Sequence, residues 1–300
     1  MNINGILCVD KPAGFTSFDV IAKLRGILKM KRLGHAGTLD PMATGVLLVF
    51  VGYATKACGI LPNENKHYIA EFQLGKISDT QDSTGKILET RDFTGISKQD
   101  ILNSISTGEI MQIPPMYSAV SVNGKRLYEL AREGKEIKRQ ARPVFIKSVS
   151  CMNFNAETGT GVLNIHCGKG TYVRTFIHDM GQSLGCGALM TNLRRSYASG
   201  FDLNSCYSLE EIQKFADNNM LTQIIIPIEK AFDSLPVIEL NIKQTRLYRN
   251  GVKLDLSQFA INFKSQQYAV YSISDGFLGT ALPDLEQNCL RIERNLCEPK

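Results

Sequence analysis

The order in which strand-like and helix-like stretches follow one another is the feature that most constrains the fold of this 300-residue chain. Short apolar runs with strand character stand at irregular intervals between amphipathic stretches, and no regular strand–helix–strand alternation develops. This order predicts an α+β fold with a mixed, mainly antiparallel central sheet flanked by helices and loops. An apolar fraction of 43% is enough for a sizeable core.

Local signals locate the main elements. Apolar periodicity predicts strands at 5–9, 45–52 and 67–74 and a helix at 17–30. Thr16 or Ser17 can cap that helix, and capping-box patterns begin further helices at Ser97 and Ser208. The stretch 75–95 is polar and rich in turn residues, so we expect a long loop or a flexible insertion there.

The composition changes after Pro236, which suggests a domain boundary. Short strand-like runs surround one small helix, 244–249, in the last part of the chain. We therefore expect a larger domain over residues 1–236 and a small β-rich domain over residues 237–300. The formal net charge of +5 and a pI near 8.7 are compatible with an RNA partner but do not establish one.

Cysteine and histidine spacing argues against a bound metal. None of the eight cysteines forms a C-x-x-C pair, and the four histidines lack zinc spacing relative to them. We expect reduced, buried thiols in a cytoplasmic protein without a structural metal. The longest apolar stretch, 45–51, is too short to cross a bilayer, and residues 1–10 lack the pattern of a secretory signal.

The densest chemical signal is the segment 34–45, GHAGTLDPMATG. Its three glycines and one proline surround a single carboxylate, Asp40, which predicts a shaped, rigid loop that presents one acid. The alternative is an ordinary Asp–Pro turn. A hydrolase triad of Asp40, His35 and Ser17 finds no support, because the chain has no G-x-S-x-G motif, and phosphate-binding glycine motifs are also missing.

The segment 34–45 resembles the signature loop of the TruB family of pseudouridine synthases. Other segments resemble family motifs in the same order: 5–17, 66–68, 112–119, 124–128, 167–175 and 193–195. The likeness runs from about residue 4 to residue 215, and it implies a pseudouridine synthase fold. Residues 237–300 are more loosely similar to the PUA-type RNA-binding domain that ends many members of the family.

The resemblance implies that the chain isomerises uridine to pseudouridine at position 55 in the T-loop of tRNA, after flipping the base out. Asp40 corresponds to the nucleophile. Its carboxylate can attack the sugar C1′, promote departure of uracil through a glycal, or add to C6 of the base, and these three routes stay open. Arg174 corresponds to the arginine that keeps Asp40 ionised. The alternative for Arg174 is an ordinary surface arginine.

Other residues correspond to the family's substrate contacts. Tyr68 matches the tyrosine that stacks on the target base and is a candidate proton acceptor, although it can also be a core aromatic residue. Tyr172 matches a second pocket contact and Leu193 an apolar wall. His35 matches the histidine that fills the space left by the flipped base, unless it is a structural histidine. Lys11 matches a residue that supports the Asp40 loop.

Partners follow from the same resemblance. The insertion 76–93 corresponds to a loop that clasps RNA, and the T-stem-loop of tRNA is the expected substrate of a monomer that uses no guide RNA and no membrane. Candidate phosphate contacts are Lys31, Arg32, Lys125, Arg126, Arg194 and Arg195. The rival functions are a pseudouridine synthase for another RNA, a guide-dependent catalytic subunit, and an RNA-binding chaperone that folds tRNA.

Overall fold

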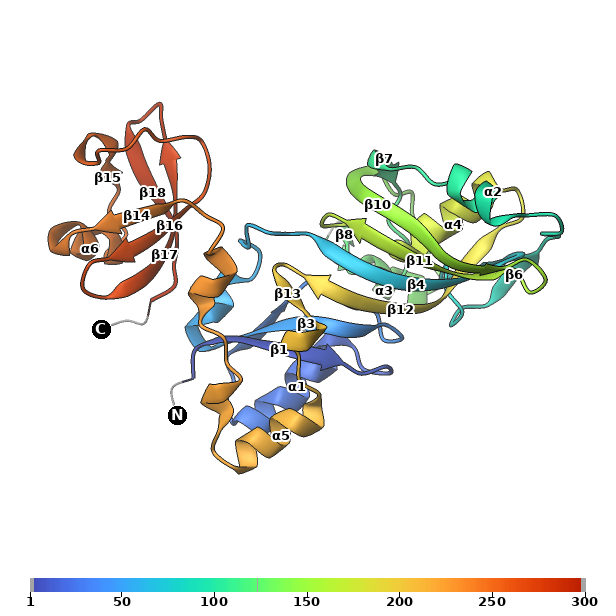
Figure 1. Ribbon diagram of the computed structural model, residues 1–300, viewed down its shortest axis with the longest axis horizontal. Helices are drawn as coiled ribbons and strands as arrows, with labels where there is room; N and C mark the ends of the chain where they lie inside the picture. Colours follow the sequence, from blue (N-terminus) through green and yellow to red (C-terminus); the bar gives the residue numbers. More distant parts are fainter. Residues whose placement is uncertain (1–2, 123, 298–300) are drawn as a thin grey trace. The chain divides into compact units, whose positions relative to one another are not determined.

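A computed structural model describes residues 3–122 and 124–297 of the chain (Figure 1). Close contacts divide the chain into two compact units. The first unit consists of Met1–Pro41, Val46–Asn63 and Ser199–Lys300, and the second of Met42–Gly45 and Glu64–Ala198. Within the described ranges, no helix is both long enough and apolar enough to cross a membrane.

Apart from its C-terminal residues, the first unit is a small group of strands covered by two helices. Its elements are β1 (Gly5–Lys11), α1 (Ser17–Leu28), β2 (Leu33–Ala36), β3 (Thr44–Val51), η1 (Gly52–Ala57), β13 (Phe201–Asp202), η2 (Leu203–Ser205), α5 (Leu209–Asp217), η3 (Leu221–Gln223) and η4 (Ile228–Phe232). Both β1 and β2 pair with β3. Helices α1 and α5 lie side by side (Figure 1). The apolar face predicted for α1, from Val20 to Leu28, is buried in the core, which confirms that prediction.

Helix α1 begins where the sequence predicts and ends earlier. Thr16 is the N-cap, and it forms a capping box with Asp19. The helix stops at Leu28 rather than Met30 because Lys29 takes a left-handed conformation with φ 52° and donates its N–H to the Arg25 carbonyl. Residues other than glycine adopt this conformation at a cost, so the sequence gives no signal for it.

The second unit contains the larger part of the sheet. Its elements are β4 (Lys66–Leu74), β5 (Lys76–Ser78), β6 (Ile87–Thr90), α2 (Lys98–Asn103), β7 (Gly108–Gln112), β8 (Ser121–Val122), β9 (Lys125–Arg126), α3 (Leu127–Arg132), β10 (Arg142–Asn155), β11 (Thr160–Cys167), α4 (Val173–Ser183) and β12 (Ala188–Ala198). The strand order is β12–β4–β11–β10–β7, with every pair antiparallel. Thr44 and Gly45, at the start of β3, pair in parallel with β12. The prediction of a mixed, mainly antiparallel sheet is therefore confirmed.

The expectation of a loop throughout 75–95 is wrong. Strands β5 and β6 form an antiparallel hairpin within this stretch. Ile77 is buried, and Asp82, in the turn between the two strands, bridges to Met190 of β12. The predicted capping boxes at Ser97 and Ser208 are present at the starts of α2 and α5. The composition of 75–95 did not predict the hairpin, because the contact that holds it, with Met190, is made by a residue far away in the sequence.

The C-terminal part of the chain forms its own five-stranded sheet with its own core. The elements are β14 (Val237–Leu240), α6 (Ile242–Arg249), β15 (Leu254–Asp255), η5 (Leu256–Gln258), β16 (Tyr268–Ser272), β17 (Gly276–Asp284) and β18 (Cys289–Asn295). The strand order is β14–β16–β17–β18–β15. Tyr248 of α6 lies in the centre of this core, and its hydroxyl group contacts the carbonyls of Thr280 and Arg294. The expected β-rich C-terminal domain is therefore present.

All eight cysteines are free. Five are buried as expected, whereas Cys58, Cys206 and Cys297 are partly exposed. Burial raises the pKa of the Cys58 thiol to about 11 and also raises that of Cys167. These thiols are therefore mostly protonated and unreactive at neutral pH.

We predict that Gly45→Ala destabilises the fold far more than Gly200→Ala. Both glycines have φ near +100°, but a Cβ on Gly45 would overlap the backbone oxygen of Arg195, whereas a Cβ on Gly200 would meet open space. The shared backbone strain costs about 1–2 kcal/mol, and the overlap at Gly45 should raise the loss to about 4 kcal/mol. Urea unfolding measures both free energies, and equal losses would contradict the steric argument.

Candidate active site

The chain presents Asp40 in the connection between β2 and β3. His35 lies on β2 opposite Val49, and the antiparallel pairing of the two strands fixes both ends of the connection. Asp40 and His35 are both half-buried, whereas Leu39 is buried beneath the loop. The loop therefore leaves the Asp40 carboxylate accessible to water, while the preceding residue, Leu39, is anchored in the core.

Ser17 holds the residue that precedes Asp40. The buried Ser17 hydroxyl accepts the N–H of Leu39 at 2.9 Å and donates to the Leu39 carbonyl at 3.2 Å. One side chain thus satisfies both polar groups of a buried backbone unit, as a neighbouring strand would. Sequence reasoning considered Ser17 as a helix cap or a triad member and missed this role, since nothing local relates it to Leu39.

Lys11 holds the residue that follows Asp40. Its buried ammonium group donates to the carbonyls of Pro12, Phe15 and Pro41 at 2.8, 2.5 and 3.3 Å. The N–H of Gly14 also donates to the Pro41 carbonyl, at 2.9 Å. The backbone is therefore fixed on both sides of Asp40, at Leu39 and at Pro41.

In the second unit, Tyr68 and Leu193 share one face of the sheet. Tyr68 lies on β4, two residues before Ala70, and Leu193 of β12 is the cross-strand partner of Ala70. Alternate residues and direct cross-strand partners face the same side of a sheet. Both side chains are buried, with exposed fractions of 6% and 5%. The cross-strand partners of Tyr68 are Ile165 on β11 and Arg195 on β12.

The opposite face of β4 carries an aromatic stack that sequence reasoning did not identify. The rings of His67 and His166 lie 3.7 Å apart between centroids, and the ring of Tyr197 stacks on His67 at 4.5 Å. Burial, and then the neighbouring His166, lower the pKa of His67. Burial, and then the charge of Arg195, lower the pKa of Lys66. The consecutive residues 66–68 are therefore divided between the two faces of the sheet.

Gln112 fixes the backbone of Tyr172 at the start of α4. The buried Gln112 amide accepts the N–H of Tyr172 at 2.8 Å and donates to its carbonyl at 3.0 Å. Because Tyr172 is the N-cap of α4, this clamp sets where the helix begins. The helix in turn carries Arg174 in its first turn. Gln112 belongs to a motif noted in the sequence, but its role depends on a contact 60 residues away.

Arg174 is buried, which rules out the surface arginine considered from the sequence. Its side chain is 4% exposed and donates to the carbonyls of Thr80 and Tyr117 at 3.0 and 2.9 Å. The guanidinium group also forms an ion pair with Asp82, at 3.6 Å between Nη1 and Oδ2. Three fixed partners leave the planar group little freedom to turn.

Asp82 is a further residue that sequence reasoning missed. Its carboxylate accepts the hydroxyl groups of Thr80 and Thr84 at 2.7 and 2.6 Å and the N–H of Thr84 at 2.9 Å. Beside it, the Thr175 hydroxyl donates to Gln81 at 2.7 Å. The turn between β5 and β6 is thus fastened to α4 through Arg174 and Thr175.

The basic residues considered as phosphate contacts have different environments. Arg195 is fully buried, which argues against that role. Arg194 donates to the Thr44 hydroxyl at 3.3 Å. The guanidinium group of Arg32 lies over the Tyr53 ring, 4.4 Å from its centroid. In the part of the chain that the structure describes, no three His, Cys, Asp or Glu side chains cluster in a way that could hold a metal ion.

Comparison with known proteins identifies the family. Residues 25–173 match the family described as TruB family pseudouridylate synthase (N terminal domain), and residues 174–233 match the tRNA pseudouridylate synthase B C-terminal domain. The chain belongs to the TruB family. The chain is 39% identical over 297 residues to tRNA pseudouridine synthase B of Clostridioides difficile (strain 630). The aligned region covers 97% of this chain and 98% of that protein.

Further relatives agree with this assignment. The protein of the same name from Clostridium perfringens (strain 13 / Type A) is 40% identical, over 99% of this chain and all of that protein. A chain of a solved Cbf5-Nop10-Gar1 complex is 24% identical with a TM-score of 0.75, covering 98% of this chain and 85% of that chain. A chain of an H/ACA RNP bound to a substrate RNA containing 2′-deoxyuridine has 21% identity, a TM-score of 0.73 and coverages of 98% and 85%. These structures confirm the fold.

We predict that Lys11→Met lowers the free energy of unfolding by about 2–3 kcal/mol, because it removes the buried ammonium group that the carbonyls of Pro12, Phe15 and Pro41 share as a donor. Lys23→Met is the matched control, since Lys23 is exposed on α1 and its loss should stay within about 0.5 kcal/mol. Urea denaturation measures both variants. A stable Lys11→Met protein would show that the ammonium group does not hold the loop.

Proposed function

We propose that the chain converts uridine to pseudouridine at position 55 in the T-loop of tRNA, with Asp40 as the nucleophile. The observation that carries this proposal is membership of the TruB family together with an Asp40 loop fixed at both Leu39 and Pro41. The reaction breaks the bond between N1 of uracil and C1′ of the ribose and forms a bond from C5 to C1′. C5 gives up its proton and N1 gains one, so no redox partner is needed.

Asp40 must be ionised to act as a nucleophile. We propose that Arg174 maintains this charge, since a guanidinium group near a carboxylate favours the ionised form. Support for this role comes from the side chain itself, which is already fixed by the Thr80 and Tyr117 carbonyls. Such a preorganised cation loses little entropy when it stabilises charge. Attack at C1′, a glycal route and addition to C6 all remain compatible with a carboxylate at this position.

The same proposal assigns the base contacts. A uridine inside a folded T-loop must leave its stack before an enzyme can reach C1′. We assign stacking on the base, and the candidate proton acceptor, to Tyr68, and the apolar wall to Leu193. We assign a second contact with the base to Tyr172, and we propose that His35 fills the space that the flipped base leaves. Tyr68 and Leu193 share one face of the sheet, which supports their joint assignment.

We further propose how the remaining parts act. Residues 1–236 form the catalytic domain, in which the insertion 76–93 clasps the RNA, and residues 237–300 form a PUA-like RNA-binding domain. The chain works in the cytoplasm as a monomer without guide RNA and needs no cofactor. Curated relatives that carry the name tRNA pseudouridine synthase B support tRNA as the substrate.

We predict that Asp40→Asn abolishes pseudouridine formation and leaves tRNA affinity within about threefold, because the amide keeps the shape of the side chain but cannot act as a nucleophile. Pseudouridine mapping of an unmodified tRNA transcript and a filter-binding titration measure the two effects. Asp217→Asn, at the exposed end of α5, should keep full turnover.

The controls separate the rival functions. A wild-type protein that binds tRNA but yields no pseudouridine in the T-loop would favour the RNA-folding chaperone. Product at another position, or only in another RNA, would favour a different substrate. If Asp40→Asn loses binding as severely as turnover, Asp40 has a structural role.

We predict that Ser17→Ala lowers kcat roughly tenfold or more with little change in KM, since a small displacement of a nucleophile has large effects. Thr16→Ala is the matched control, because the neighbouring hydroxyl only caps α1. It should cost about 1 kcal/mol of stability and preserve kcat. Steady-state kinetics at a temperature where both variants are folded decides between them. Equal kcat values would exclude a positioning role for Ser17.

A further inference from the structure

Two cysteines from distant parts of the sequence lie next to each other in the first unit. Cys8 lies on β1, and Cys206 directly follows η2. The residues after them, Val9 and Tyr207, form a parallel bridge. In this bridge the N–H of Tyr207 donates to the Cys8 carbonyl at 3.0 Å, and the N–H of Asp10 donates to the Tyr207 carbonyl at 3.0 Å. The candidate active site uses neither cysteine.

The register of this bridge brings the two thiol groups together. Cys206 has an extended backbone, with φ −98° and ψ 149°, so it continues the pairing one residue before Tyr207. Partners at equal register face the same side, and neighbouring strands lie about 4.8 Å apart. A disulfide needs about 4.4–6.8 Å between its two Cα atoms, so paired strands satisfy this requirement. A hydrogen bond with the Cys206 side chain, followed by burial, raises the pKa of the Cys8 thiol.

Short-range bonds hold the segment that carries Cys206. The Asp202 carboxylate accepts the N–H groups of Asn204 and Ser205 at 3.0 and 3.3 Å, which fixes η2. The N–H of Cys206 donates to the Leu203 carbonyl at 3.1 Å, and its thiol donates to the Asp202 carbonyl at 3.3 Å. The Cys206 sulfur is therefore held beside β1.

The two thiols differ in what can reach them. Both are free, but Cys8 is fully buried, whereas Cys206 is partly exposed. A small oxidant in the solvent therefore meets Cys206 first, and Cys8 reacts only with what has formed on Cys206. A buried thiol in this position can convert a sulfenic acid into a disulfide before oxidation goes further.

We propose that peroxides oxidise Cys206 and that Cys8 resolves the product to an intramolecular disulfide. In the first step the Cys206 sulfur attacks one oxygen of hydrogen peroxide as its thiolate. An S–O bond forms, the O–O bond breaks, and the thiol proton ends in the water that leaves.

In the second step the Cys8 sulfur attacks the Cys206 sulfur. The S–S bond forms, the S–O bond breaks, and the Cys8 proton leaves with the hydroxyl group as a second water. Two electrons pass from the thiols to the peroxide, and a dithiol reductant reverses the change. The disulfide joins the strand that ends at Lys11 to the residue after η2, and it protects Cys206 from irreversible oxidation to sulfinic acid.

The test treats the folded protein with hydrogen peroxide, alkylates the remaining thiols, and maps peptides by mass spectrometry without reduction. We expect a peptide pair that joins Cys8 to Cys206, with both thiols recovered after dithiothreitol. In Cys8→Ala, sulfinic acid at Cys206 should exceed the wild-type level at least about tenfold, because no thiol resolves the sulfenic acid. Cys206→Ser leaves the core intact and should abolish the oxidation of Cys8.

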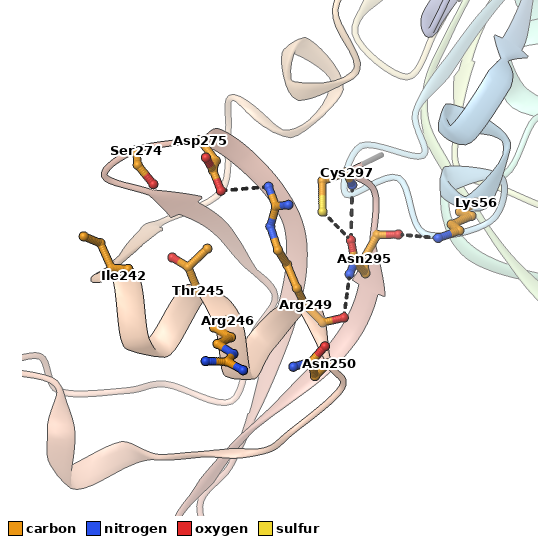
Figure 2. Close-up of a pocket in the computed structure, with 10 residues that line it drawn as sticks. All are labelled: Lys56, Ile242, Thr245, Arg246, Arg249, Asn250, Ser274, Asp275, Asn295 and Cys297. Atoms are coloured by element: carbon orange, nitrogen blue, oxygen red, sulfur yellow. Dashed lines mark hydrogen bonds and ion pairs between the residues drawn. The ribbon is translucent and has the colours of Figure 1, made fainter. Parts of the chain in front are cut away.

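Cys297→Ser is the matched control, because Cys297 is also partly exposed. Its thiol donates to the Asn295 side chain at 2.8 Å in a cleft beside α6 (Figure 2). Among the ten described residues that line this cleft, Cys297 is the only cysteine, so no neighbour there can resolve its oxidation. This variant should form the disulfide between Cys8 and Cys206 as readily as wild type does.

Several results would overturn the proposal. They are an unreacted Cys206, sulfinic acid at Cys206 of wild type without a bond to Cys8, and a disulfide from Cys206 to another cysteine or another chain. Protein unfolded in urea should pair its cysteines without selectivity, because the register that joins β1 to Cys206 is then lost. If the unfolded protein links Cys8 to Cys206 as selectively as the folded protein does, the structural argument fails.

Discussion

Buried cations bonded to backbone carbonyls are the interaction on which both parts of the candidate site depend. A charged group inside a protein is costly unless it is fully hydrogen-bonded. Lys11 meets this demand with the carbonyls of three loop residues, and Arg174 with those of Thr80 and Tyr117. Each cation thereby joins segments that are distant in the sequence: Lys11 bonds to Pro41, and Arg174 bonds to Thr80 and Tyr117.

Features encoded within a few neighbouring residues could be predicted from the sequence. The apolar face and N-terminal cap of α1, the capping boxes that begin α2 and α5, and the alternating pattern of β4 all depend on contacts inside one element or its first turn. The irregular order of elements was enough to predict a mixed, mainly antiparallel sheet. The motifs around Asp40 identified the family, because several matches in a fixed order are a global signal even when each is short.

Contacts between distant segments could not be predicted in this way. Arg174 reaches carbonyls 94 and 57 residues away, and nothing in the local sequence names them. The hairpin of β5 and β6 looked like a loop, because its stability comes from Asp82 and from bonds to α4 and β12. The bond from Ser17 to Leu39 was missed for the same reason. Every residue has a backbone carbonyl, so a hydrogen bond to one places no requirement on the side chains of the acceptor segment. The sequence of that segment therefore does not reveal the bond.

The state of the native thiols has a practical consequence for studying the hairpin of β5 and β6. Five cysteines are buried, and the raised pKa of Cys58 makes it a slow nucleophile at neutral pH. Replacing Cys206 and Cys297 would remove the other partly exposed thiols. A cysteine placed at Leu88, which is 62% exposed on β6, would then react selectively with a fluorescent label. The chain is thus well suited to site-specific spectroscopy of how this hairpin responds to RNA.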